Sequence, residues 1–172
     1  MKVTLSMAMS VNGIIADKNG SEDFLSHDNW IAFVKLANKI GSNIWGRKTY
    51  EAVKKWEGDY LKELKSVKKI IISTDSTLAL DPEFTLATSP QDALSKLEAK
   101  GKQEALVTGG PTINSEFIKA GLVDEMILTV EPKLMGQGIP LFSPSDFELK
   151  LKLINIENLT PNHIALRYKV MK

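Results

Sequence analysis

The chain of 172 residues contains no cysteine and only two histidines, His27 and His163, which lie far apart in the sequence. Without thiolates, the sequence excludes disulfides, iron–sulfur clusters, cysteine nucleophiles and thiolate zinc sites. No apolar run is long enough to cross a bilayer, and Thr4, Ser6 and Ser10 interrupt the apolar N-terminal segment, unlike in a signal peptide. We therefore expect a cytoplasmic protein without a metal site and without a membrane partner.

Charge of one sign is also lacking, because 22 basic residues are balanced by 21 acidic ones and the net charge is +1. A chain without a basic patch is not expected to bind nucleic acid. Its length and its 43% of hydrophobic residues are typical of one globular domain, which we place over residues 1–172.

Strand and helix patterns alternate along most of the chain. Hydrophobic periodicity and turn residues predict strands at 2–9, 43–45, 69–74, 84–88, 104–108 and 125–130, and helices at 30–40, 47–56, 90–100 and 111–120. Residues 10–27 are predicted to form a loop, and residues 147–156 and 163–170 a hairpin. This order predicts an α/β fold of three layers, α/β/α, with a mainly parallel sheet and a C-terminal antiparallel hairpin at its edge.

Ligands of such sheets bind beyond the carboxyl ends of the strands, so binding residues are expected in the segments that follow each strand. Gly46-Arg47-Lys48-Thr49 lies where a strand meets a helix, a position that favours anions. Arg47 is one of only two arginines in the chain, and arginine favours bidentate contact with phosphate. A solvated first turn of a helix explains this segment equally well.

Two further strand ends carry small or hydroxyl-bearing residues. Thr108-Gly109-Gly110-Pro111-Thr112 allows a close approach of the backbone to a ligand, or is simply a tight turn. Ser73-Thr74-Asp75-Ser76 fits a ribose or a phosphate, or an ordinary capped turn. Together the three segments favour an elongated ligand with several phosphates, such as a dinucleotide, although neither a Rossmann fingerprint nor a Walker A loop is present.

An ordered set of motifs extends over nearly the whole chain. It comprises Asn12-Gly13-Ile14-Ile15-Ala16, Gly46 to Glu51, Ile70 to Thr74, Val107 to Pro111, Leu122 to Glu125 and Pro132 to Gly138. In these motifs the sequence resembles the dihydrofolate reductase-like superfamily, and most closely stand-alone proteins similar to the reductase domain of the riboflavin-biosynthesis deaminase-reductase. The resemblance implies an NADPH-dependent reductase that forms a homodimer.

The resemblance also implies where the cofactor lies. Ala8 and Ile15 would flank the nicotinamide, and Ser73 and Thr74 would line the adenine ribose. The phosphates would be held by two segments, made up of Gly46, Arg47, Lys48 and Thr49 and of Gly109, Gly110, Pro111, Thr112 and Ile113.

On the substrate side, Asp28 and Thr129 match the carboxylate and threonine pair of dihydrofolate reductases. An apolar pocket would raise the pKa of such a carboxyl group and suit it to proton relay, although Asp28 would serve equally as a helix cap. Asn12 and Trp30 are the candidate substrate-binding residues. Trp30 is placed to stack on a flat heteroaromatic substrate, or else belongs to the core.

Departures from the family pattern bear on the substrate. Val67 and Lys68 stand where dihydrofolate reductases have an arginine, which disfavours folate. Asn12 and Thr108 stand where riboflavin-pathway reductases usually have Asp and Glu. We therefore expect an NADPH-dependent reductase of a pteridine- or pyrimidine-like molecule. The alternatives are 5-amino-6-(5-phosphoribosylamino)uracil reductase, dihydrofolate reductase and a nucleotide-binding module without catalysis.

Overall fold

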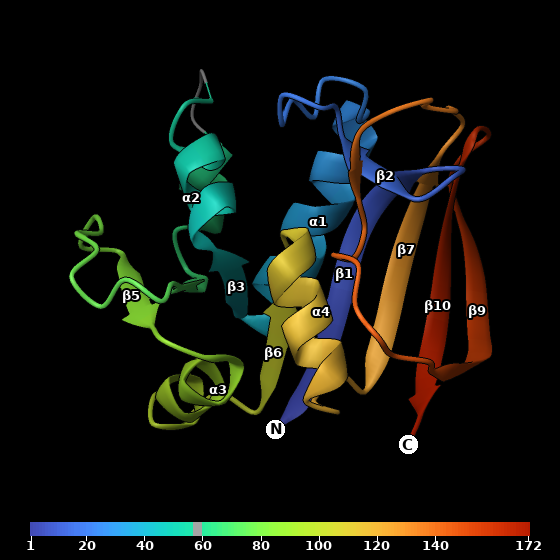
Figure 1. Ribbon diagram of the computed structural model, residues 1–172. Coiled ribbons are helices and arrows are strands. Elements are labelled where there is room, and N and C mark those ends of the chain that lie inside the picture. The colour runs from blue at the N-terminus through green and yellow to red at the C-terminus, as the bar shows by residue number, and fades with distance from the viewer. Residues whose placement is uncertain (57–59) are drawn as a thin grey trace.

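The computed structural model describes residues 1–56 and 60–172 and is built on an eight-stranded sheet in the order β5-β4-β3-β6-β1-β7-β10-β9 (Figure 1). The parallel part consists of β1 (Lys2–Ser10), β3 (Ser42–Gly46), β4 (Lys68–Ile72), β5 (Phe84–Ala87), β6 (Glu104–Val107) and β7 (Glu125–Glu131). The hairpin of β9 (Lys150–Thr160) and β10 (His163–Met171) adds two antiparallel strands at one edge. A separate two-stranded sheet pairs β2 (Ile14–Ala16) with β8 (Ile139–Pro140).

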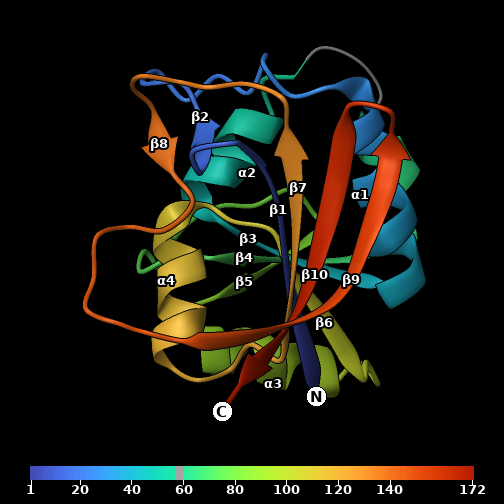
Figure 2. The ribbon, with the colours of Figure 1, turned by 90° about the vertical axis from the view of Figure 1, so that its right-hand side faces the viewer.

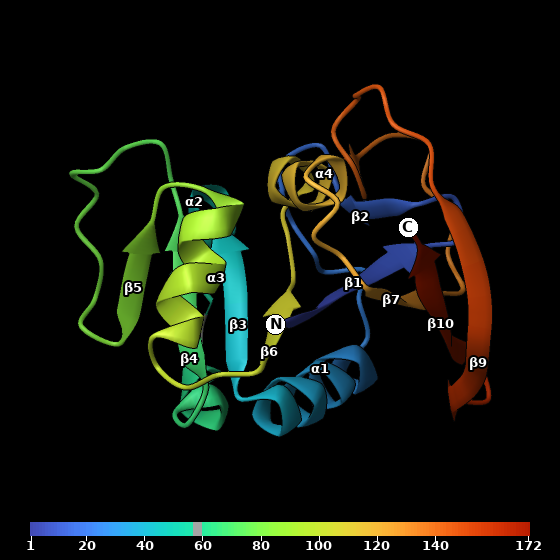
Figure 3. The ribbon, with the colours of Figure 1, turned by 90° about the horizontal axis from the view of Figure 1, so that it is seen from below.

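Helices cover both faces of the main sheet. Figure 3 shows α1 (His27–Ile40) on one face and α3 (Pro90–Glu98) and α4 (Pro111–Lys119) on the other. The short helices α2 (Arg47–Val53) and η1 (Tyr60–Leu64) share a core with α1 that includes Ala37, Trp45 and Leu64. The opposite core packs residues of α3 and α4 against β1 and β6. The predicted three-layer α/β/α architecture is confirmed.

Local sequence explains why these elements form where they do. The isoleucine run of β4 is buried on both faces, with Ile70 in one core and Ile71 in the other. Helix α3 begins at Ser89, whose hydroxyl accepts a hydrogen bond from the N–H of Asp92 at 3.1 Å, and Pro90 occupies the first turn.

Several predicted boundaries are wrong. Helix α1 begins at His27, within the segment predicted to be a loop, and α2 ends at Val53 rather than at residue 56. The short strands β2 and β8 and the helix η1 were not predicted, because elements this short carry almost no periodic signal. Strand β9 begins at Lys150 rather than at Phe147, because the Phe147 ring packs against Phe142, with 5.4 Å between ring centroids.

Two negative findings apply to residues 1–56 and 60–172. No helix there is both long enough and apolar enough to cross a membrane. No group of three histidine, aspartate or glutamate side chains lies close enough together there to hold a metal ion.

Candidate functional site

The carboxyl ends of β3 and β6 form the point where the sheet reverses its winding. The two strands are neighbours, but the helices that follow them lie on opposite faces of the sheet. Helix α2 shares the core of α1, whereas α4 shares the core of α3. Sheets of this topology usually bind their ligand in a crevice beyond such a point. The N–H of Gly46 donates a hydrogen bond of 2.8 Å to the carbonyl of Gly109 across this point.

Glycines allow the two chain segments to approach so closely. A Cβ atom at Gly46 would lie 2.7 Å from Cγ1 of Ile113, too close for two carbon atoms, whereas one at Gly110 would make an ordinary contact of 3.5 Å with Oγ1 of Thr49. Gly109 has a φ of +98°, which favours glycine, and its peptide bond to Gly110 is cis. The structure thus brings together two of the segments that the sequence singles out, at the glycines themselves. We call these two segments, residues 46–49 and 109–113, the glycine junction.

The helices that start at the glycine junction have no side-chain cap. Both α2 and α4 begin at a glycine, Gly46 and Gly110, and neither N-cap makes a side-chain hydrogen bond. Helix α3, at the edge of the sheet, is capped by Ser89. In α3 the Ser89 hydroxyl binds a first-turn N–H group, but no side chain of the described residues does so in α4. The first-turn N–H groups of α4 are therefore available to an acceptor from outside the chain.

Arg47 and the turn after β4 lie on one side of the glycine junction. Arg47 donates a hydrogen bond of 2.8 Å from Nη1 to Glu51, and its side chain is 46% exposed. Hydrogen bonds from the hydroxyl and the N–H of Thr77 lower the pKa of Asp75, and the nearby charge of Arg47 lowers it further. Ser73 is buried and accepts the N–H of Asp75 at 3.1 Å, whereas Thr74 is exposed. The third predicted segment therefore lies near Arg47, with Ser73 engaged in a capped turn.

On the other side of the glycine junction, the end of β1 lies beside β7. Ala8 pairs with Thr129, which is 7% exposed, and Ile15 of β2 is buried. Beside Gly109, the hydroxyl of Thr108 donates a hydrogen bond of 2.9 Å to Oδ1 of Asn43. Lys48 and Thr112 are exposed, and Pro111 is half-buried.

The structure corrects the surroundings expected for Asp28. Its side chain is exposed, at the second residue of α1, so it does not lie in an apolar pocket. No hydrogen bond joins Asp28 to Thr129 in the part of the chain that the structure describes. The next residue, Asn29, is the one that turns inward, and it is 8% exposed. Because neighbouring residues of a helix point in different directions, a shift of one position decides which side chain is buried.

Trp30 belongs to an aromatic cluster. Its ring lies edge to face with Tyr60 at 5.1 Å and with Trp56 at 5.6 Å between centroids, and it is tilted against Phe33 at 5.2 Å. Its Nε1 donates a hydrogen bond of 2.6 Å to Glu63. These contacts favour the packing interpretation of Trp30 over the predicted role in stacking on a substrate.

Asn12 ties two loops together. Its Nδ2 donates to the carbonyl of Met135 at 2.8 Å, and its Oδ1 accepts the N–H of Met135 at 3.2 Å and the hydroxyl of Ser10 at 2.8 Å. This pairing gives Asn12 a structural role, and its predicted substrate contact stays a prediction.

A buried polar cluster at the end of β7 was not predicted. It consists of Glu131, Asn29 and His163, which the fold brings together from distant parts of the sequence. The available signal was the acidic residue at the end of an apolar strand, Glu131 before Pro132.

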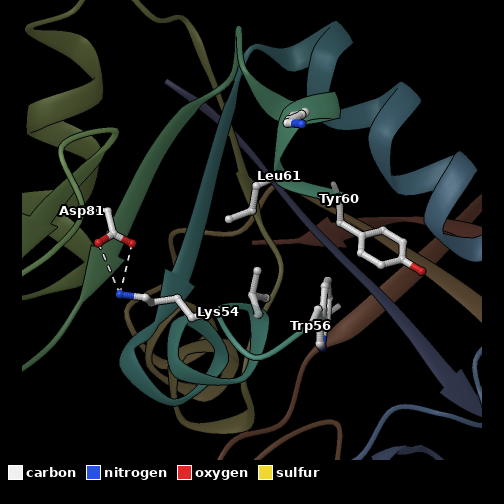
Figure 4. A pocket seen from close by; sticks show the side chains of 7 residues that line it. Lys54, Trp56, Tyr60, Leu61 and Asp81 are labelled. Atoms are coloured by element: carbon white, nitrogen blue, oxygen red, sulfur yellow. Dashed lines mark hydrogen bonds and ion pairs between the residues drawn. The ribbon is translucent and has the colours of Figure 1, made fainter. Parts of the chain in front are cut away.

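Two pockets among the described residues lie away from the glycine junction. One, of about 240 Å³, is lined by Val53, Lys54, Trp56, Tyr60, Leu61, Lys62 and Asp81 (Figure 4). Lys54 lies 3.1 Å from Asp81 there, so its charge is already paired. A second, of about 270 Å³, is lined by residues of the loop after β2 and by Lys133 and Met135. The glycine junction is the candidate site, because the sheet reverses its winding there and α4 begins there without a side-chain cap.

Comparisons with known proteins agree with this reading of the fold. The chain is 26% identical to the uncharacterized protein YyaP of Bacillus subtilis (strain 168) over 97% of this chain and 94% of that protein. It is 31% identical to YwjB of the same strain over 88% of each chain. A shorter match, 29% identical over 40% of this chain, covers 20% of the riboflavin biosynthesis protein RibD of Aquifex aeolicus.

Solved structures show the same fold. A protein from Shewanella sp. PV-4 that is assigned to riboflavin biosynthesis matches with a TM-score of 0.80 and 27% identity over all of both chains. RibD of Acinetobacter baumannii matches with a TM-score of 0.80 and 22% identity over 99% of this chain and 58% of that one. The model of one family, the RibD C-terminal domain, matches residues 1–165. The resemblance seen in the sequence is thereby confirmed, and the chain belongs to the RibD C-terminal domain family.

Proposed function

We propose that this protein is an NADPH-dependent reductase of a small pyrimidine-like or pteridine-like molecule. The observation that carries the proposal is the glycine junction, where β3 and β6 meet at Gly46 and Gly109 and where α4 begins without a cap. Membership of the RibD C-terminal domain family supports the class of reaction.

The residues of the glycine junction fit a dinucleotide. Helix α4 begins at Gly110 without a side-chain cap, so the N–H groups of its first turn can bind a pyrophosphate. Arg47 and the exposed Lys48 offer positive charge to further phosphates, and Thr49 and Thr74 offer hydroxyl groups. These features also favour NADPH over NADH, because an additional phosphate needs cationic partners.

When bound, the cofactor supplies two electrons and one hydrogen to a C=N or C=C bond of the substrate, and a proton from water or from an acid completes the reduction. The chain's part is to place the reactants against each other and to limit the access of water. Ala8 and Ile15, which lie beside β7 and in β2, provide small and apolar surface for the nicotinamide. Thr129 and the exposed Asp28 border the same end of the sheet.

The second candidate reaction is the reduction step of riboflavin biosynthesis. One solved structure of similar fold, from Thermotoga maritima, is described as a diaminohydroxyphosphoribosylaminopyrimidine deaminase and 5-amino-6-(5-phosphoribosylamino)uracil reductase. In this chain, however, Asn12 is bound to Met135, and the hydroxyl of Thr108 is bound to Asn43. Neither position supplies a carboxylate, so we favour a substrate that needs none there.

Parallel titrations with NADPH and NADH test cofactor binding. We expect NADPH to bind in the micromolar range, and Arg47→Ala to weaken its binding about tenfold, or about 1.4 kcal/mol. Protein fluorescence or calorimetry measures both dissociation constants. Arg167→Ala is the matched control, because the only other arginine pairs with Glu125 on β7 and should not affect the nucleotide. Absence of binding by either nucleotide would contradict the proposal.

Turnover distinguishes a reductase from a nucleotide-binding module. NADPH oxidation is followed at its near-ultraviolet absorbance with 5-amino-6-(5-phosphoribosylamino)uracil, dihydrofolate and dihydropterin as probes. Oxidation that depends on one of these rings supports the enzyme. Tight NADPH binding without oxidation by any of the three favours the binding module.

A further inference from the structure

The carboxylate of Glu131, the last residue of β7, is buried, with 3% of the residue exposed. Its Oε1 accepts the N–H of Ser26 at 2.8 Å and a hydrogen bond from the side-chain amide of Asn29. Its Oε2 lies 2.7 Å from Nε2 of His163. Both oxygens are thus occupied by groups of the protein itself, which leaves Glu131 no free oxygen for a ligand.

The hydrogen bonds continue into the C-terminal hairpin. Nδ1 of His163 lies 2.6 Å from Oγ1 of Thr160, on the opposite side of the hairpin turn. We call Ser26, Asn29, Glu131, His163 and Thr160 the Glu131 network. It joins the start of α1, the end of β7 and the turn between β9 and β10, which lie at the same end of the molecule (Figure 2).

Helix α1 needs this connection, because it has no cap of its own. Ser26 is its N-cap residue, yet the Ser26 side chain makes no capping bond to the helix backbone. Glu131 supplies a negative charge and an acceptor at that helix end, where both are stabilising. A residue about 100 positions away in the sequence therefore accepts the N–H of the N-cap residue, as the glutamate of a capping box does.

The position of the Glu131 network links it to the proposed site. In the register of β1 and β7, Glu131 pairs with Ser10 and Thr129 pairs with Ala8, so the carboxylate lies two residues beyond Thr129 on the same face of β7. That face is turned toward α1, whose first turn carries Asp28. The first turn of α1 therefore borders the end of the sheet at which we place the reaction.

We propose that Glu131 is a positioning residue for the reduction, an inference that rests on the proposed function. It holds the first turn of α1 in place against β7 and the C-terminal hairpin, and so fixes the substrate side of the crevice. The glycine junction uses other strand ends, so cofactor binding does not depend on Glu131.

Two variants distinguish a positioning role of Glu131 from a requirement for its negative charge. Glu131→Gln keeps an acceptor for the N–H of Ser26, and its amide can donate to His163. Glu131→Ala removes every bond. Lys69→Met is the matched control, because it removes another buried charged side chain, the partner of Glu83 on β4, away from α1. If Glu131→Ala does not fold, Asn29→Ala replaces it, since it removes one bond to the same oxygen.

The first measurement is amide hydrogen exchange in residues 26–32, without any ligand. We expect at least about tenfold faster exchange there in Glu131→Ala, near-normal exchange in Glu131→Gln, and no local change in Lys69→Met. Unchanged protection of these amides in Glu131→Ala would overturn the inference, whether or not the wild-type protein proves to be a reductase.

The second measurement is steady-state reduction by NADPH of whichever of the three ring probes the wild-type protein reduces. We expect Glu131→Ala to raise the KM of this substrate about tenfold and to leave the NADPH dissociation constant within about twofold, and Glu131→Gln to restore the KM. An equal rise of KM in Glu131→Ala and Glu131→Gln, with amide protection intact, would overturn the positioning role, because the negative charge of Glu131 would then be what the reaction requires. If the wild-type protein does not oxidise NADPH, the proposed function fails, and hydrogen exchange alone decides the structural claim.

Discussion

At the scale of single residues, Gly46 is the position of the glycine junction with the least room for a side chain. A Cβ atom at Gly46 would overlap the buried side chain of Ile113. A glycine in this place is a packing requirement of the two strand ends, and it can be tested without knowledge of the ligand.

Gly46→Ala should destabilise the protein by about 1–3 kcal/mol, because its methyl group would overlap Ile113. The additional change Ile113→Ala makes room for the methyl group. The cost of Gly46→Ala should therefore be smaller in that background than in the wild type. Denaturant unfolding of the four proteins of this cycle measures the coupling. Additive effects would show that the two residues do not compete for the same space.

The same scale shows the limits of sequence reasoning. Glycine pairs, proline at a helix start and serine caps act locally, so the segments around Gly46 and Gly109 could be identified from neighbouring residues alone. Asn29, Glu131 and His163 could not, because Glu131 meets its partners only after the sheet has formed. Asp28 is predicted from its match to the carboxylate of dihydrofolate reductases, and that match does not reveal that the neighbouring Asn29 is the buried residue.

Among the elements, β9 forms one of the two edges of the main sheet, opposite to the shorter edge strand β5. Strand β9 is long and carries exposed apolar side chains, with Leu151 40%, Leu153 48%, Ile154 50% and Ile156 55% exposed. Such an edge favours pairing with another strand. Lys150 and Lys152 lie toward one end and Glu157 toward the other, so an antiparallel pairing with a second copy would bring opposite charges together.

We therefore predict a homodimer formed through β9. The double variant Ile154→Lys with Ile156→Lys should be a monomer, with a thermal midpoint close to that of the wild type measured as a monomer. Ile31→Lys, at an apolar residue of α1 that is 54% exposed, should leave the dimer intact. Light scattering after size exclusion, over a range of concentrations, measures the mass. A wild-type protein that remains monomeric at high concentration would contradict the prediction.

Helices and strands of four or more residues with local sequence signals are easier to predict than very short strands. The buried isoleucines of β4 and the capped start of α3 have clear local signals, whereas β2 and β8 exist only because they pair with each other. The two-stranded sheet they form follows from the loops that Asn12 ties together, a contact between residues far apart in the chain.

For the molecule as a whole, one partly buried acid links stability to pH. Burial raises the pKa of Glu22 to about 7, above its ordinary value of 4.5. A folded-state pKa above the unfolded one means that stability is fully present below the unfolded pKa and is lost as the pH rises through the folded pKa. Glu22 should therefore reduce the free energy of unfolding as the pH rises from about 4.5 to 7.

Glu22→Gln should remove this dependence. The variant should match the wild type near pH 4 and exceed its free energy of unfolding by about 1–3 kcal/mol at pH 8. Denaturant unfolding at several pH values measures the difference between the two proteins. Asp23→Asn, a change at the exposed neighbouring residue, serves as the control. A difference that stays constant from pH 4 to pH 8 would contradict the pKa assigned to Glu22.

The contact between Gly46 and Gly109 also has a consequence for biosynthesis. The two glycines belong to halves of the chain that the ribosome produces at different times, and their strands can pair only after β4, β5 and α3 have been made. A nascent chain therefore has no crevice until α4 leaves the exit tunnel, because β6 and its helix complete it. If nucleotide binds at the glycine junction as proposed, it would stabilise only chains in which β6 and α4 have been made, since a ligand stabilises the folded state that binds it.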